Sequence, residues 1–298
     1  MDDTGRRPFR AVKGPIPLTA LRWGFKTSPQ HTTWDAIRDV WLEADRVPAF
    51  EHGWLFDHLN PIVGDPDGPC LEGWTTLTAL AAITERIRVG LMVAGNTYRH
   101  PALHAHMAAT ADVISHGRID FGIGAGWNEY EHASKGIPLH APGERIRRLD
   151  EACEVVRLLW TQPVADFDGR WYQLAQARLA PKPVQQPHPP IVIGGNGEKL
   201  TLRVVAKHAD IWNFSGTDPD ELRRKQAVLR EHCAAVGRDP AEIEVSVQVR
   251  ADYDDPSTTV ATLRPLIDAG ATHLVLMLAP PYPAGVIARL AADVVGAF

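Results

Sequence analysis

The feature that most constrains the fold of this chain is an alternation of short apolar segments with amphipathic helical segments, repeated eight times. Residues 53–57 are apolar on both faces, which is typical of a parallel strand covered on both sides. Residues 34–44 instead carry apolar side chains at helical spacing after a capping Thr32 or Thr33, and Pro48 ends that helix. Eight such units in 298 residues predict an α/β protein with a closed (β/α)8 TIM barrel. The remaining strands are predicted at 22–26, 87–94, within 117–129, and at 190–194, 211–214, 243–249 and 273–278.

The predicted barrel accounts for residues 1–298 as a single domain. Residues 1–20 are expected to form a loose N-terminal lead. Residues 127–189 are expected to form an insertion between the fourth and fifth strands. This insertion carries a long amphipathic helix at 143–161 and a hairpin at 166–174, followed by an irregular segment rich in proline.

Charge and cysteine content limit the classes of partner. The net charge of -5 provides no basic surface for nucleic acid or anionic membranes. Cys70, Cys153 and Cys233 are widely spaced and match neither a disulfide framework nor a zinc motif. No run approaches the roughly 18 apolar residues of a membrane helix. We therefore expect a cytoplasmic protein that acts on a small-molecule substrate and has no nucleic-acid or membrane partner.

In a (β/α)8 barrel the functional residues lie at the C-terminal ends of the strands. The fourth predicted strand ends there in alternating glycines, Gly122, Gly124 and Gly126, followed by an aromatic and polar cluster. The glycines either turn the chain or let a flat or anionic ligand approach the backbone. Their spacing does not match the G-x-G-x-x-G dinucleotide fingerprint.

Two further strand ends carry candidate binding groups. The segment 194–197, Gly-Gly-Asn-Gly, follows a strand and opens a helix, so it is either a phosphate cradle or an ordinary tight turn. Arg99 is a second candidate for the same anion, or a surface arginine. At the end of the second strand, His58 is the preferred general acid or base, with Asp57 beside it.

Other chemistries find less support in the sequence. His100 and His104 can meet on one face of a helix, but no nearby carboxylate completes a metal site, so no metal is predicted. The chain has neither a G-x-S-x-G elbow nor an S-x-x-K motif. Lys26 is the nearest fit to the lysine of a phosphate-binding aldolase or lyase.

Three ordered motifs, at 54–58, 90–101 and 117–129, resemble the bacterial luciferase-like monooxygenase superfamily, specifically its branch of oxidoreductases that use the deazaflavin coenzyme F420. The segment 190–214 is similar as well. The resemblance implies a bacterial luciferase-like barrel that holds the cofactor ring at the strand ends and the phosphate tail in later loops. It also implies a non-proline cis peptide at Met92-Val93 and a catalytic role for His58.

The resemblance has one departure. Sugar-phosphate dehydrogenases of this branch have a glutamate directly after the loop that corresponds to residues 124–126, whereas this chain has Trp127 there and Glu129 two residues later. An apolar wall at Trp127 favours a less polar organic substrate. The candidate catalytic residues are His58, Asp57, Trp127 and Glu129. The candidate cofactor-binding residues are Asp57, Met92, Val93, Arg99, Gly124, Ala125, Gly126, Asn128, Gly194, Gly195, Asn196 and Gly197.

These observations predict an F420-dependent oxidoreductase that transfers a hydride between the deazaflavin and a small organic substrate. One alternative is an FMN-dependent monooxygenase that uses reduced flavin and oxygen. Another is a protein that binds F420 or flavin without catalysis. The resemblance further implies a homodimer and a separate cofactor-reducing enzyme as redox partner.

Overall fold

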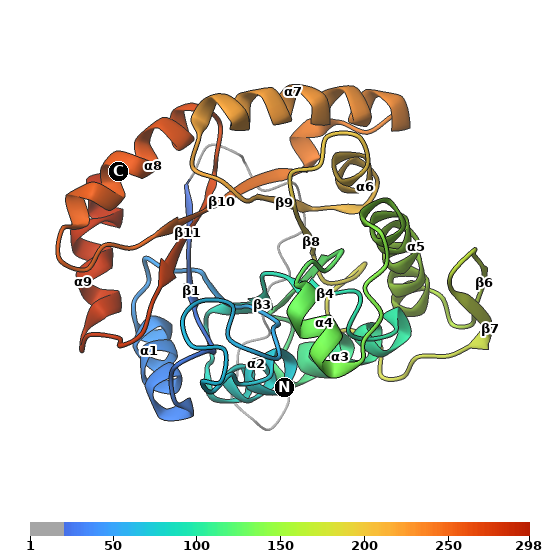
Figure 1. The fold of residues 1–298 in the computed structure, drawn as a ribbon, viewed down its shortest axis with the longest axis horizontal. Helices are drawn as coiled ribbons and strands as arrows, with labels where there is room; N and C mark the ends of the chain where they lie inside the picture. The colour runs from blue at the N-terminus through green and yellow to red at the C-terminus, as the bar shows by residue number, and fades with distance from the viewer. Residues whose placement is uncertain (1–20) are drawn as a thin grey trace, which may run out of the picture.

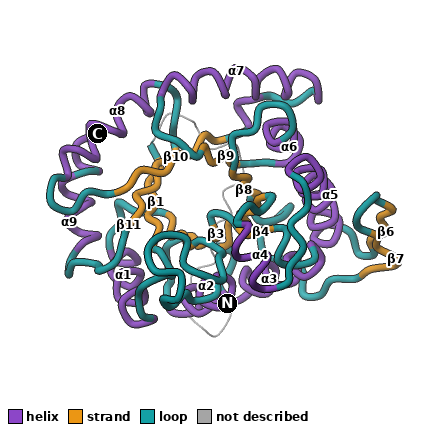
Figure 2. Tube along the Cα trace, in the orientation of Figure 1, coloured by secondary structure: helices purple, strands orange, loops and turns teal. Residues whose placement is uncertain are grey.

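The computed structural model describes residues 21–298, in which parallel strands close a barrel inside a ring of helices (Figures 1 and 2). Neighbouring strands pair in the order β3-β2-β1-β11-β10-β9-β8-β5-β4, and a pairing of β3 with β5 closes the ring. The predicted barrel is therefore confirmed, whereas the predicted lead lies outside the described residues. The barrel strands are β1 (Arg22–Thr27), β2 (His52–Leu55), β3 (Arg88–Leu91), β4 (Ala94–Gly95), β5 (Ile119–Gly124), β8 (Ile191–Gly194), β9 (Ile211–Phe214), β10 (Glu244–Arg250) and β11 (His273–Leu278).

Helix termini follow capping chemistry that is visible in the sequence. Thr33, one of the two predicted residues, caps α1 by accepting a hydrogen bond from the amide of Ala36, and Asp218 caps α7 in the same way. Within residues 21–298, no helix has the length and apolar character needed to cross a lipid bilayer. The helices are α1 (Trp34–Arg46), α2 (Gly73–Ile83), α3 (Pro101–Ile114), α4 (Glu129–Lys135), α5 (Pro142–Thr161), α6 (Thr201–His208), α7 (Pro219–Val236), α8 (Pro256–Asp268) and α9 (Val286–Asp293).

The segment between β5 and β8 differs from the predicted insertion in one respect. Its long helix, α5, packs against both α3 and α6 and occupies a place in the barrel's helix ring (Figure 1). The buried stripe that includes Leu149, Val156 and Trp160 faces the core, which explains this position. The material added to the barrel is therefore α4 and the antiparallel hairpin of β6 (Ala165–Asp168) and β7 (Gln173–Ala177), which lies beyond α5 in Figure 1.

A bulge divides the third barrel strand into β3 and β4. Val89 pairs with Ile119, but Ala94 pairs with Ile123, so the divided strand has one more residue than β5 over the same length. The extra residue lies around the peptide between Met92 and Val93, which is cis as the resemblance implied. The bulge lies at the C-terminal end of the barrel, beside the end of β5.

The barrel interior consists of layers with different chemistry. A central apolar cluster combines Trp54, Met92, Val192, Ile211 and Val275, which come from five different parts of the barrel wall and meet inside it. Polar layers lie on either side of this cluster. The layer at the strand N-termini contains three contacts: Arg22 Nη1 to Glu244 Oε2 at 2.6 Å, His52 Nδ1 to His273 Nε2 at 2.9 Å, and Arg88 Nε to Asp120 Oδ1 at 3.0 Å.

Candidate active site

The loop after β2, the loop after β4 and helix α4 converge on one buried carboxylate, Glu131. Its Oε2 atom lies 2.7 Å from Nδ1 of His58 and also accepts a hydrogen bond from the hydroxyl of Tyr98. Its Oε1 atom accepts hydrogen bonds from the backbone amides of Leu59 and Asn60, the latter at 3.0 Å. Glu131 thereby fixes the position of His58 and of the chain that follows it.

The environment of Glu131 favours its ionised form. Burial opposes ionisation, but the hydrogen bonds from His58, Tyr98 and the Leu59 amide outweigh that effect and lower the pKa of Glu131 to about 2. Burial and the bond to Glu131 raise the pKa of Tyr98, which therefore stays protonated. The site thus holds an ionised carboxylate that accepts hydrogen bonds from two neighbouring side chains, His58 and Tyr98.

Two aromatic rings flank His58. The ring of Trp127 meets the imidazole edge-on, with centroids 5.6 Å apart, and Phe56 packs similarly at 5.2 Å. Trp127 is 59% exposed, although it is large and apolar, so its indole presents an uncovered face beside the histidine. This exposed face is consistent with a wall for a weakly polar ligand.

Asp57 points away from His58 and forms a separate ion-pair network. Its buried carboxylate accepts hydrogen bonds from Arg99 Nη1 at 2.6 Å and from the amide of Gly95 at 3.2 Å, and Arg99 also binds Glu72. Burial raises the pKa of Asp57, although Arg99 opposes this shift. Because two carboxylates already engage Arg99, a phosphate at this guanidinium would have to compete with both.

The glycines at the ends of β5 and β8 make room for the bulge between β3 and β4. A Cβ atom on Gly124 would lie 2.7 Å from Cγ2 of Val93, and a Cβ atom on Gly194 would lie 3.3 Å from the same atom. A Cβ atom on Gly122 would overlap the carbonyl oxygen of Leu91. The glycine pattern therefore has a packing cause inside the protein.

The predicted phosphate segment, 194–197, is more irregular than expected. Gly195 has a φ of 127°, and helix α6 begins at Thr201 rather than directly after the glycines. Asn196 ties the segment to the end of β9, since its side chain donates to Ser215 O at 2.8 Å and accepts from Ser215 N at 3.0 Å. No side chain of residues 21–298 caps α6, so the segment and the helix start retain amides that can bind an anion.

The residues after β5 form a helix that the sequence analysis did not predict. Asn128 caps α4 by accepting from the amide of Glu131 at 3.1 Å, so its side chain is occupied in the cap. Glu129 is exposed, whereas Glu131 is fully buried and contacts His58. The Asn-x-x-Glu spacing at 128–131 resembles a capping box and is the signal that could have revealed this helix.

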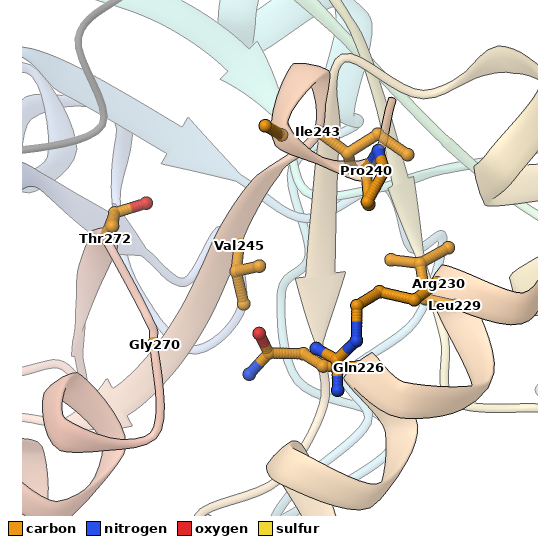
Figure 3. A pocket seen from close by; sticks show the side chains of 9 residues that line it. Gln226, Leu229, Arg230, Pro240, Ile243, Val245, Gly270 and Thr272 are labelled. Carbon is orange, nitrogen blue, oxygen red and sulfur yellow. The ribbon is translucent and has the colours of Figure 1, made fainter. Parts of the chain in front are cut away.

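Two other features lie apart from these strand ends. A cavity of about 290 Å³ opens between α7 and the beginnings of β10 and β11, where Arg230, Val245 and Thr272 contribute to its lining (Figure 3). Asp150, Glu154 and His208 place ligand-type atoms within 4.8 Å of one another. Neither feature contains a predicted site residue.

Comparisons with known proteins identify the family of this chain. A family model described as luciferase-like monooxygenase matches residues 19–284. A protein of Mycobacterium tuberculosis is 36% identical over 254 residues, which cover 81% of this chain and 82% of that protein. The F420-dependent glucose-6-phosphate dehydrogenase of Microbacterium testaceum is 29% identical over 236 residues, covering 78% of this chain and 68% of the dehydrogenase.

A solved structure shows the same fold. An F420-dependent secondary alcohol dehydrogenase, in complex with an F420-acetone adduct, matches with a TM-score of 0.82 and covers 93% of this chain and 99% of its own. At 18% sequence identity, this match is evidence for the fold only. On the extent of the family match, the chain belongs to the luciferase-like monooxygenase family and is an oxidoreductase.

Proposed function

We propose that this chain transfers a hydride between the deazaflavin coenzyme F420 and a small organic substrate. The observation that carries the proposal is the His58–Glu131 pair, which lies at the C-terminal end of the barrel. The similarity to an F420-dependent dehydrogenase supports the choice of cofactor. When bound, the deazaflavin would supply the hydride chemistry. The protein would bind and orient the cofactor and the substrate, and it would exchange the proton.

In this proposal, His58 exchanges the proton that accompanies the hydride. An ionised carboxylate can only accept hydrogen bonds, so Glu131 requires the hydrogen of His58 to reside on Nδ1. Nε2 then remains available to take a proton from a substrate hydroxyl, or to return one in the reverse direction. Glu131 also stabilises the imidazolium that forms when Nε2 is protonated.

Groups at the strand ends fit the remainder of a deazaflavin. The segment 194–197 and the uncapped start of α6 would bind its phosphate. The side-chain oxygen of Asn96, which is buried beside the end of β4, has no hydrogen-bond donor among residues 21–298 and could accept one from a ligand.

The polarity of the site suggests the substrate class. The exposed indole of Trp127 lies against His58, where a sugar-phosphate dehydrogenase of this branch would have a carboxylate. A secondary alcohol or the corresponding ketone combines an apolar body with one oxygen that can exchange a proton with His58. We therefore propose small, weakly polar alcohols and carbonyl compounds as substrates.

The test is a parallel titration of the protein with F420 and with FMN, followed by tryptophan fluorescence. We expect F420 to bind more tightly than FMN. We also expect at least one alcohol of a test panel to reduce bound F420, with no consumption of oxygen. Far tighter binding of FMN, with oxygen consumed by the reduced flavin, would instead identify a monooxygenase. Tight binding with no turnover across the panel would identify a non-catalytic carrier.

Replacement of the histidine tests its role separately from cofactor binding. We expect His58→Ala to lower turnover by about 100-fold or more, since that is a common contribution of a general acid or base. The affinity for F420 should remain nearly unchanged, because the proposed phosphate contacts lie elsewhere. Unchanged turnover would remove His58 from the mechanism.

A further inference from the structure

Three polar side chains cross the barrel interior above the apolar cluster, and we call Lys26, Asn213 and Gln248 the floor strip. Lys26 Nζ donates to Gln248 Oε1 at 2.7 Å, and Gln248 Nε2 donates to Asn213 Oδ1 at 2.6 Å. The three residues come from β1, β9 and β10. They therefore form one continuous hydrogen-bonded row across three parts of the barrel wall.

Strand register places the floor strip toward the catalytic end. Residues that pair on adjacent parallel strands share a face of the sheet, and Lys26 pairs with Trp54 of the apolar cluster. Asn213 follows the clustered Ile211 by two residues and pairs with Gly194, the last residue of β8. The strip is thus an inward-facing layer next to the ends from which His58 and the segment 194–197 extend.

Among residues 21–298, no carboxylate balances the charge of Lys26. Its ammonium group has three hydrogens to donate, and its side-chain partner is the neutral amide of Gln248. None of the ion pairs formed by residues 21–298 includes Lys26, whereas Arg99 is held by Asp57 and Glu72. Burial lowers the pKa of Lys26 to about 8, so the residue is still mostly charged at neutral pH.

We propose that Lys26 is the counterion for the negative charge that the ring cofactor gains when it accepts a hydride. This inference rests on the proposed function, in which the ring binds at these strand ends. With the cofactor bound, the substrate C–H bond would break and a C–H bond would form at the ring, while the hydroxyl proton would pass to Nε2 of His58. The ring would thereby gain one electron pair and one negative charge, spread over its pyrimidine nitrogen and oxygen atoms.

His58 and Lys26 have separate tasks in this proposal. His58 receives the proton lost from the substrate, and the ammonium of Lys26 balances the charge on the ring without a proton transfer. FMN also becomes anionic when it is reduced by a hydride, so the role of Lys26 is the same for either ring. Lys26 is partly buried and has no carboxylate partner among residues 21–298, and a bound anion would offset the cost of holding its charge there.

The test compares the affinities of oxidised and reduced F420, measured separately and without oxygen, for the wild type, Lys26→Met and Lys26→Arg. We expect Lys26→Met to weaken binding of the reduced form by about 10-fold to 100-fold, the value of a hydrogen bond between charged groups. Binding of the oxidised form should change less than about threefold. Lys26→Arg should retain most of the preference for reduced over oxidised F420. A thermal melt of each variant shows that it is folded.

Lys182→Met is the matched control. Its ammonium binds the carbonyl oxygens of Leu159 and Gln162 at the end of α5, and the ratio of the two affinities should not change. Equal weakening of both forms by Lys26→Met would show a packing role, and no weakening of either would show that the charge faces another ligand. Either result overturns the proposal.

The proposed function and the role of Lys26 can fail separately. If the wild type binds FMN and not F420, the cofactor assignment fails. The ratio of the affinities for the oxidised and reduced cofactor is then measured with FMN. If it binds F420 without selective weakening in Lys26→Met, the role of Lys26 fails alone. If it binds neither ring, both proposals are wrong.

Discussion

At the scale of single residues, the site depends on which glutamate of α4 faces the protein. Glu129 and Glu131 are two residues apart, and on a helix such positions point in different directions. Glu131 is buried against His58, whereas Glu129 is exposed. The carboxylate beside the histidine is therefore the third residue of α4 and not the first, which was the candidate named from the sequence.

Glu131→Gln should slow turnover without preventing cofactor binding. The substitution removes the charge that stabilises a protonated His58 and the preference for hydrogen on Nδ1. We expect kcat to fall by about 10-fold to 100-fold, a part of the usual general acid–base contribution, and the F420 dissociation constant to stay within about threefold. Glu129→Gln, on the same helix, should change neither quantity. Wild-type kcat in Glu131→Gln would show that the pair does not act in catalysis.

At the scale of elements, the bulge between β3 and β4 and the glycines of β5 and β8 depend on each other. The extra residue of the bulge brings Val93 against Gly124 and Gly194, where other residues would place a Cβ atom. A β-bulge re-aims side chains next to an active site in many proteins. Here it moves Val93 inward at the end of the barrel where the site lies.

This dependence predicts a compensating pair of substitutions. Gly124→Ala should destabilise the protein by about 1–3 kcal/mol through overpacking, since the new methyl group would lie 2.7 Å from Val93. In the Val93→Ala background the same change should cost less, with a coupling of at least about 0.5 kcal/mol in urea unfolding. Additive effects would contradict the contact. Gly122→Ala should not be rescued, because its methyl group meets the backbone oxygen of Leu91.

At the scale of the whole molecule, buried histidines make the barrel sensitive to acid. Burial, reinforced by the charge of Arg22, lowers the pKa of both His52 and His273 well below 6.5, and burial lowers that of His104 to about 3. Above pH 6.5 these residues are neutral in both the folded and the unfolded chain. Below it, the unfolded chain takes up protons that the folded chain excludes, so stability falls with pH.

The free energy of unfolding should therefore decrease by about 1.4 kcal/mol per pH unit for each buried histidine as the pH falls from 6.5 to 5. Burial raises the pKa of Asp57 and Glu244, and proton uptake by these groups in the folded chain opposes the loss of stability. The stability that ionised Glu131 contributes is lost only below pH 4.5. His104→Leu should lower the slope measured by urea unfolding, whereas the exposed His106→Leu should not. An unchanged slope in His104→Leu would refute this account.

The alternation of apolar and helical patterns was sufficient to predict the barrel, because strand and helix periodicities depend on local spacing alone. The same local chemistry predicted a cap at Thr32 or Thr33, of which Thr33 is the cap, and the motifs of the resemblance predicted the cis peptide at Met92-Val93. Even the long helix at 143–161 was found, although its place in the barrel ring was not.

Only the tertiary structure decided which side chains meet. His58 and Glu131 are 73 positions apart, and Lys26 and Gln248 are 222 apart, so no local pattern relates them. Their contacts depend on the direction in which each loop leaves the barrel and on which face of each strand turns inward. Closure of the barrel sets both of these, because it brings the ends of strands distant in sequence to one rim and selects one face of each strand for the interior.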